Sequence, residues 1–273
     1  MEQEIFLLWM ALVVYVLAGT FSMIMTLLDR PLGGALLAMM LGGLMLHGIS
    51  LGLRWERLGH GPFINQFEII SSNLWSLTLF FCLVYWRVVA IRKLASVVLP
   101  ILFVLIGWIL VVDPLNSEYP PTYNTVWLYI HIGLGKVFLG AALVAAALGV
   151  VILLRAIGGW MMGRTLFAVL PGDASLDELG YRLLAIAFVF DTLMIVAGAI
   201  WAQDAWGRYW NWDPLEVWSL VNWLLVTMAL HLRPTFHISA RVGAVVGILV
   251  FVVAFINFFG VPFLSQTTHR GVF

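Results

Sequence analysis

Cysteine and charge are the two features that this sequence has least of. Its one cysteine, Cys82, lies inside an apolar run, which excludes disulfide frameworks, cysteine-ligated metal clusters and thiol relays. Charged residues make up 10% of the chain and cancel to a net charge of zero, so the composition gives no indication of nucleic-acid binding. The first four residues include Glu2 and Glu4 and no basic residue, and they precede an apolar run long enough to cross a membrane, which is unlike a signal peptide.

Apolar residues dominate the remainder. They make up 63% of the chain, and the mean hydropathy of +1.02 is typical of a polytopic membrane protein. Lipid leaves unpaired backbone groups unsatisfied, so each spanning run must be helical. The sequence therefore predicts an all-α membrane bundle, in one domain over residues 1–273. The eight predicted spans are 5–28, 33–53, 69–86, 94–112, 125–154, 183–201, 215–232 and 240–259.

Lysine and arginine are unevenly distributed between the predicted loops. The loops that follow the first, third, fifth and seventh spans hold nine of these residues, whereas the opposite side holds four. Cytoplasmic loops carry the excess of positive residues in membrane proteins. Both termini and the loop between the sixth and seventh spans are therefore predicted to lie outside the cytoplasm.

That loop, about residues 201–214, is unusually rich in tryptophan. It carries Trp201, Trp206, Trp210 and Trp212, four of the 13 tryptophans, and Trp218 follows on the next span. Anchoring at a membrane surface needs one or two indoles. A group of tryptophans this large, beside an arginine, suits a large, flat, partly apolar ligand with acidic groups on one edge. Haem fits that description. Arg208 is the expected partner of a haem propionate, because a guanidinium matches a carboxylate in geometry and charge. Asp213, just before Pro214, is expected to cap the next helix.

Histidines flank this loop. His131, at the start of the fifth span, and His269, beyond the eighth, are predicted on the same side as the tryptophans, which favours bis-histidine ligation of iron. Taken singly, each is equally consistent with an ordinary interfacial histidine. His231 lies about 20 Å of helix rise beyond Trp218, near the cytoplasmic end of its span. It is either a second functional site inside the membrane or a side chain that reaches the interface beside Arg233.

Two further charges fall inside predicted spans. Lys136 lies five residues after His131, and Asp191 lies ten residues before Trp201. Because isolated charges are costly in a membrane, we predict that they pair; the alternative is that one of them faces a water-filled cavity.

The segment from Trp206 to Trp218 resembles the WWD signature of the haem-handling membrane proteins. Residues 61–68, Gly-Pro-Phe-Ile-Asn-Gln-Phe-Glu, resemble an element that precedes the third span in the CcsA/ResC branch of that superfamily. The next residue is Ile69, where the branch has serine. The segment from Asn257 to Ser265, followed by His269, resembles the closing segment of the same branch. The similarity extends from about residue 45 to the end.

The resemblance implies a subunit of the System II cytochrome c synthase, in a bacterial cytoplasmic or thylakoid-type membrane. It implies that haem b is moved or presented across the membrane and attached to the Cys-x-x-Cys-His thiols of apocytochrome c, with a separate CcsB/ResB partner. His131 and His269 match the external haem ligands, and His231 matches the ligand of an inner haem site. The residues expected to bind the cofactor are Trp201, Trp206, Arg208, Trp210, Trp212, Asp213 and Trp218.

Other functions remain as alternatives. A relay of the CcmC type would bind haem and pass it to a chaperone without attaching it, although the closing segment and the eight spans disfavour this reading. A di-haem cytochrome b subunit would need two histidine pairs, spaced about 13 residues apart within facing helices, whereas the predicted spans carry single histidines. A purely structural scaffold would leave the tryptophan cluster unexplained.

Overall fold

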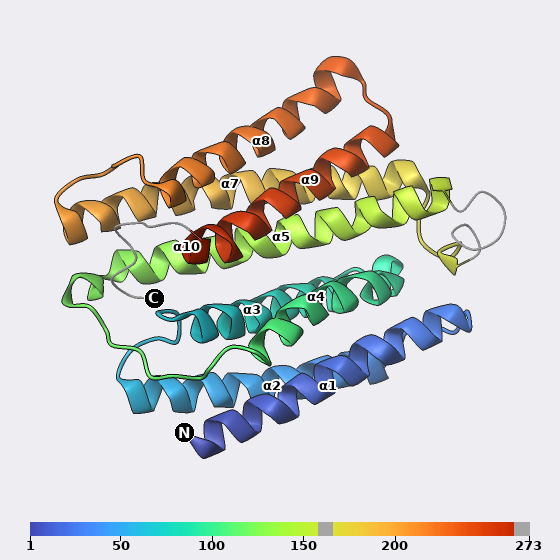
Figure 1. The fold of residues 1–273 in the computed structure, drawn as a ribbon. Helices are drawn as coiled ribbons and strands as arrows, with labels where there is room; N and C mark the ends of the chain where they lie inside the picture. The colour runs from blue at the N-terminus through green and yellow to red at the C-terminus, as the bar shows by residue number, and fades with distance from the viewer. Residues whose placement is uncertain (158–165, 265–273) are drawn as a thin grey trace. The chain divides into compact units, whose positions relative to one another are not determined.

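The computed structural model describes residues 1–157 and 166–264, which form helices and loops without a strand. Eight helices in these ranges are long and apolar enough to cross a membrane, which confirms the predicted all-α membrane fold (Figure 1). They are α1 (Glu2–Leu27), α2 (Gly34–Leu58), α3 (Gln66–Arg87), α4 (Ala95–Ile109) with the preceding 3-10 helix η1 (Val89–Leu94), α5 (Val126–Ile157), α7 (Asp173–Trp206), α8 (Pro214–Phe236) and α9 (Ala240–Phe259). Two shorter helices are η2 (Pro121–Tyr123) and α10 (Val261–Leu264).

Several helices extend further than the apolar runs predict. The main difference is in α7, which continues through Trp206 and ends at Gly207, whose φ of 72° breaks the helix. Gln203 and Asp204 are polar, yet neither prevents a helix from continuing beyond the hydrocarbon. Trp201 and Trp206 therefore lie on a helix, and the non-helical part of the predicted tryptophan loop is only 207–213.

The chain divides into two compact units. Unit 1 comprises Met1–Ser117 with Leu153–Gly172, and unit 2 comprises Glu118–Ile152 with Asp173–Phe273. In unit 1, α1 and α3 each pack against both α2 and α4. In unit 2, α7, α8 and α9 pack against one another. The part of α5 that belongs to unit 2, 126–152, approaches α9 closely, since a Cβ on Gly149 would lie 2.8 Å from the Ala244 carbonyl oxygen. The predicted extent of a single domain, 1–273, stays a prediction.

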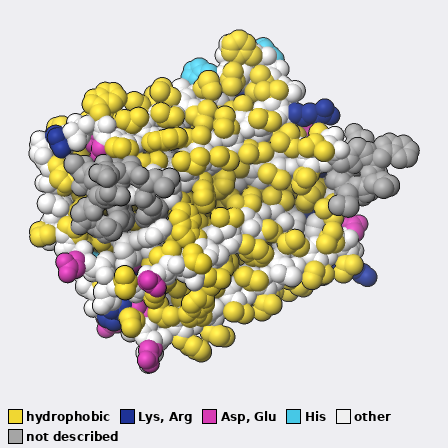
Figure 2. All heavy atoms as spheres, in the orientation of Figure 1, with side chains coloured by type: hydrophobic (Ala, Val, Ile, Leu, Met, Phe, Trp, Pro, Cys, Tyr) yellow, Lys and Arg dark blue, Asp and Glu magenta, His cyan; other side chains and the backbone are white. Residues whose placement is uncertain are grey.

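The exposed surface is largely apolar. Hydrophobic side chains cover the middle of the face seen in Figure 2, while the charged side chains visible there lie toward two opposite edges. Many large apolar residues are exposed along the spans, among them Phe6, Ile49, Leu193 and Leu224. This distribution is what a lipid environment requires, because the apolar band then faces the hydrocarbon and the helix ends meet water.

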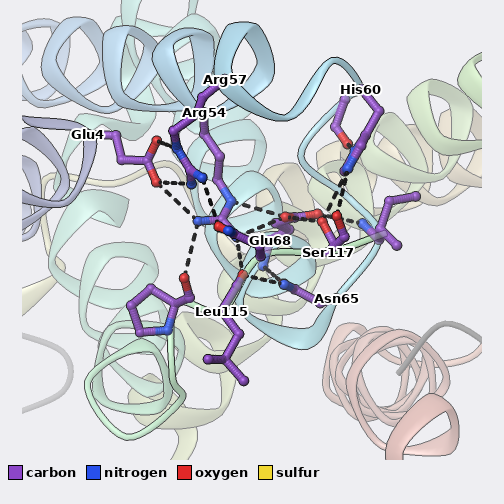
Figure 3. A network of polar contacts seen from close by, with 12 residues as sticks. Glu4, Arg54, Arg57, His60, Asn65, Glu68, Leu115 and Ser117 are labelled. Atoms are coloured by element: carbon purple, nitrogen blue, oxygen red, sulfur yellow. Dashed lines mark hydrogen bonds and ion pairs between the residues drawn. The ribbon is translucent and has the colours of Figure 1, made fainter. Parts of the chain in front are cut away.

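A buried ion network joins α1, α2 and α3 in unit 1 (Figure 3). Arg54 donates from Nε to Glu68 Oε1 at 3.0 Å and from Nη1 to Glu4 Oε1 at 3.2 Å. Arg57 donates from Nε to the other oxygen of Glu4 at 2.9 Å. The exposed fractions of Arg54, Glu4 and Glu68 are 3%, 3% and 0%. Each of these charges is thus removed from solvent and matched by an opposite charge.

The same network holds the chain segment that follows α4. Arg54 donates to the carbonyl of Leu115, Asn65 Nδ2 donates to that carbonyl at 2.9 Å, and the Ser117 hydroxyl donates to Glu68 Oε1 at 2.6 Å. Asn65 also caps α3, since its Oδ1 accepts from the backbone N–H of Glu68 at 2.9 Å. Asn65 and Glu68 belong to the element that resembles the CcsA/ResC branch. Their contacts in this structure are to the protein's own backbone and side chains.

We predict that Arg54→Met lowers the free energy of unfolding of unit 1 by about 3–5 kcal/mol, because Glu4 and Glu68 lose a buried counter-charge. Glu68→Gln, which keeps the shape of the side chain, should also destabilise the protein. The measurement is thermal unfolding of the purified protein in detergent or nanodiscs. The control is Arg182→Met, which breaks an exposed i,i+4 pair with Glu178 and should leave the midpoint unchanged. Equal midpoints for Arg54→Met and the wild type would show that the network does not stabilise unit 1.

Candidate functional site

The tryptophan-rich segment 207–213 is fastened to the start of α8. Asp213 is the N-cap residue, and its Oδ1 accepts hydrogen bonds from the backbone N–H groups of Leu215 at 2.9 Å and Glu216 at 3.1 Å. Pro214 occupies the first helical turn, where its missing N–H costs nothing. The predicted capping role of Asp213 is confirmed. Its side chain is 7% exposed and is engaged in holding the helix end.

Two further features fix the path of this segment. Glu216 Oε2 accepts a hydrogen bond from the backbone N–H of Asn211 at 2.6 Å, so α8 also holds the middle of the loop. Trp212 adopts a φ of 61°, in the left-handed region that non-glycine residues rarely occupy. The Asp213 cap and the hydrogen bond from Asn211 to Glu216 hold the backbone on either side of Trp212. The Trp212 side chain remains 69% exposed. The segment therefore presents an indole outward from a fixed backbone.

Ring contacts join the four tryptophans of this segment in two pairs. Trp201, which is 6% exposed, packs edge-on against Tyr123 with ring centroids 5.1 Å apart and against Trp206 at 4.9 Å. Trp210 and Trp212 form a second pair at 5.7 Å. Burial raises the pKa of the Tyr123 hydroxyl to about 12, so this neighbour of Trp201 stays neutral at physiological pH. One group is thus built into unit 2, and the other lies on the loop.

His131 packs with the first of these groups. Its ring stacks on Trp201 with centroids 6.1 Å apart and planes 28° from parallel. Its Nδ1 lies 2.8 Å from the backbone carbonyl oxygen of Met194 on α7. A carbonyl oxygen only accepts, so Nδ1 carries the proton and Nε2 carries the lone pair. Protein histidines that ligate metals are held in this way, with the non-ligating nitrogen donating to a carbonyl or carboxylate.

A glycine makes room for the imidazole. A Cβ placed on Gly198 would lie 2.7 Å from His131 Nδ1, closer than real contacts allow. Met194, Gly198 and Trp201 are spaced four and three residues apart, so they share one face of α7. We did not identify Met194, Gly198 or Tyr123 from the sequence. In the sequence, a glycine spaced between two large apolar residues on one helix face indicates a close contact with another helix. It does not indicate which helix lies opposite.

The remaining predicted site residues near this end are more exposed. Arg208 and Tyr209 are exposed on the loop, and Trp218 is 36% exposed on α8. Trp210 differs, because its indole N–H is buried without a hydrogen-bond partner among the described residues. His269 lies outside the described residues, so its predicted role beside His131 stays a prediction.

His231 lies at the other end of α8, about 27 Å of helix rise from Asp213. Its side chain is exposed, and its Nδ1 donates to the carbonyl oxygen of Thr227, one turn earlier, at 2.9 Å. The proton is again on Nδ1, as at His131, which leaves Nε2 as the nitrogen suited to a metal. No three His, Cys, Asp or Glu side chains in the described part of the chain gather as a metal site.

The predicted pairing of Lys136 with Asp191 is wrong. Both carboxylate oxygens of Asp191 are buried and have no hydrogen-bond partner among the described residues, which excludes a bond from the Lys136 ammonium group. The sequence gives the depth of each residue along its helix. It does not give the direction in which each side chain points around the helix axis, and pairing depends on that direction.

Comparison with known proteins places the chain in a family. The family model described as "Cytochrome C assembly protein" matches residues 63–269. A cytochrome c biogenesis protein CcsA from Mesostigma viride is 27% identical over 249 residues, which covers 82% of this chain and 81% of that protein. The CcsA protein of Prochlorococcus marinus (strain AS9601) is 28% identical over 249 residues, covering 82% of this chain and 80% of the other.

Among solved structures, cytochrome c heme lyase CcmF has the same fold. The TM-score is 0.68 at 19% sequence identity, over 99% of this chain and 48% of CcmF, so the chain spans about half of that protein. The apolar helices and these relatives together identify an integral membrane protein. The chain belongs to the cytochrome C assembly protein family and is a CcsA-type cytochrome c biogenesis protein, as its WWD segment and residues 61–68 indicate.

Proposed function

We propose that the chain binds haem b where His131 meets the tryptophan-rich end of unit 2, and that it presents this haem for covalent attachment to apocytochrome c. The observation that carries the proposal is the orientation of His131. Its Nδ1 proton is held by the Met194 carbonyl, its ring stacks on Trp201, and its Nδ1 lies close to the bare backbone of Gly198. An imidazole fixed in rotation and tautomer is prepared to bind iron through Nε2.

The loop supplies contacts suited to the remainder of a porphyrin. Trp212 and Tyr209 are 69% and 61% exposed, so they are available to pack on a flat apolar ring. Arg208, which lies beside them and is exposed, is proposed to bind a propionate. Trp201 is proposed to act through His131, because its buried indole packs on the imidazole. Trp206 and Trp210 would border the same surface.

The number of spans and the Lys/Arg distribution support a position for this site outside the cytoplasm. His269 is proposed as the second ligand, from the family resemblance. His231 is proposed to bind a second haem inside the membrane, where its exposed position would let a CcsB/ResB-type partner supply the other ligand. Bound haem would supply the two vinyl groups that react, and the apocytochrome would supply the thiols.

This chain itself contributes positioning. Its one cysteine, Cys82, is buried at 3% exposure in α3 and is therefore unsuited to act as a nucleophile. The work left to the protein is to hold the macrocycle, orient its edge and fix the imidazole. A preformed arrangement of this kind speeds the reaction because it lowers the entropy that the reactants lose when they come together.

We predict that His131→Gly abolishes haem binding at this site and that added imidazole restores it, because the free ligand fills the space of the lost side chain. Low-spin haem absorption of the purified protein is the measurement. His237→Gly is the control, since His237 ends α8 in a left-handed conformation that glycine adopts readily. Full haem loading of His131→Gly without imidazole, with His231 also replaced by Ala, would contradict the proposal.

A subtler change tests orientation. We predict that Gly198→Ala weakens haem binding, because the new methyl group would displace the imidazole by its contact with Nδ1. The matched control is Gly180→Ala on the same helix, where a Cβ meets no atom within 4 Å. Both changes favour helix formation equally, so a difference in haem affinity between them reports on the ring. Identical affinities would show that this contact does not position the ligand.

Attachment is tested separately from binding. With a CcsB/ResB-type partner and a Cys-x-x-Cys-His reporter in one cell, we expect haem that remains on the reporter after denaturation. The expected attachment is lost with His131→Gly and with a reporter whose two cysteines are replaced by serine. Haem binding by the complex without attachment to the intact reporter would instead support a relay that hands haem to another protein.

A further inference from the structure

Two polar side chains in the interior of unit 2 lack hydrogen-bond partners. Both oxygens of Asp191 on α7 and both amide atoms of Asn222 on α8 are buried and unbonded among the described residues. Each side chain is 0% exposed. Buried polar groups in folded proteins are almost always bonded to protein or to ordered water. Two such exceptions with four unbonded atoms therefore indicate that a further group satisfies these side chains.

The two residues lie at the same depth. Trp223 Nε1 donates to Thr192 Oγ1 at 2.9 Å, and this bond fixes the register of α8 against α7. Asp191 and Asn222 are the residues immediately before that bonded pair on two consecutive, antiparallel helices (Figure 1). The Thr192 hydroxyl donates to the Phe188 carbonyl at 2.8 Å, so it is already engaged as donor and acceptor. It is therefore unable to donate to Asp191 as well.

No charge is matched to the Asp191 carboxyl group. Between Glu216 and Arg233 on α8, and from Val242 to the end of α9, the sequence contains no Asp, Glu, Lys or Arg. The first part of α5 carries one, Lys136, which does not bond to the Asp191 oxygens. The histidines and tyrosines of these helices lie toward helix ends: Tyr129 and His131 near the start of α5, Tyr181 near the start of α7 and His231 near the end of α8. An isolated carboxylate is unstable in such surroundings and takes up a proton instead.

We propose that Asp191 and Asn222 form an internal binding site for water and a proton in the core of unit 2. A protonated carboxyl group offers one donor and acceptor oxygens, and the amide offers two donors and an acceptor. A water molecule both donates and accepts hydrogen bonds. It therefore satisfies the carboxyl group and the amide where the two are too far apart to bond directly. Buried water in proteins has two to four polar partners of this kind. A divalent cation is not favoured, since calcium takes six to eight oxygen ligands and the site offers few.

The site is distinct from the proposed haem ligand. Asp191 lies three residues before Met194, so it is about one helical turn below the carbonyl that holds His131. It contacts neither the imidazole ring nor the tryptophan-rich loop in any described hydrogen bond. The proposal therefore stands whether or not His131 binds iron, and its tests use the protein without haem.

Infrared spectroscopy tests the proton. The wild-type protein at neutral pH should show the carbonyl band of a protonated carboxylic acid, shifted in D₂O, and Asp191→Asn should lack it. Asp204→Asn, which removes an exposed carboxylate near the end of α7, is the matched control and should retain the band. Lys136→Met should retain it too. Identical spectra for the wild type and Asp191→Asn would mean that Asp191 is ionised, and the proposal would be overturned.

Radiolytic labelling tests the water. Hydroxyl radicals formed from an internal water should oxidise Met194, which is 3% exposed and lies one turn from Asp191. The double variant Asp191→Leu, Asn222→Leu replaces both polar groups with apolar ones of similar size and should lose this oxidation. Met228, which is 50% exposed on α8, monitors the radical dose, and thermal unfolding checks that the variant folds. Equal oxidation of Met194 in both proteins, or none in the wild type, would contradict a hydrated site.

Discussion

Hydrocarbon offers no hydrogen bonds, and this constraint explains most of what the structure does with its few polar groups. Helices satisfy the backbone between their ends. At the ends, side chains take over: Asn65 caps α3 and Asp213 caps α8. Where charge is buried it is matched, as with Arg54 between Glu4 and Glu68. The same rule makes Asp191 and Asn222 conspicuous, because all four polar atoms of these two side chains are buried and unbonded among the described residues.

The candidate haem ligand depends on backbone contacts more than on side-chain chemistry. His131 is oriented by a main-chain carbonyl, and the space for its ring exists because Gly198 has no side chain. Both features follow from how closely α5 and α7 approach each other. The imidazole is therefore positioned by helix packing, and a side chain added at Gly198 on α7 would meet its Nδ1. Such contacts are as important to a metal site as the ligand itself.

The tryptophan-rich segment combines two different structural roles. Trp201 and Trp206 belong to α7 and pack with Tyr123 and His131, which places them within the framework of unit 2. Trp212 lies on the short loop, in a strained backbone conformation held by the cap of α8. Composition treats these indoles as one cluster. In the structure Trp201 packs on the imidazole from α7, whereas Trp212 is exposed on the loop, and the end of α7 at Gly207 falls between them.

Hydropathy and motif were sufficient to predict the eight spans, the family and the cap at Asp213, since these depend on residues close together in the chain. The Arg54 network and the contacts of His131 with the Met194 carbonyl and with Gly198 were not predictable in this way, because they join residues from different helices. The error over Lys136 and Asp191 has the same origin. A sequence fixes how far along a helix each side chain lies, through a constant rise per residue. Only the packed structure decides which way it points and what it meets, because rotation about each helix axis is set by its neighbours.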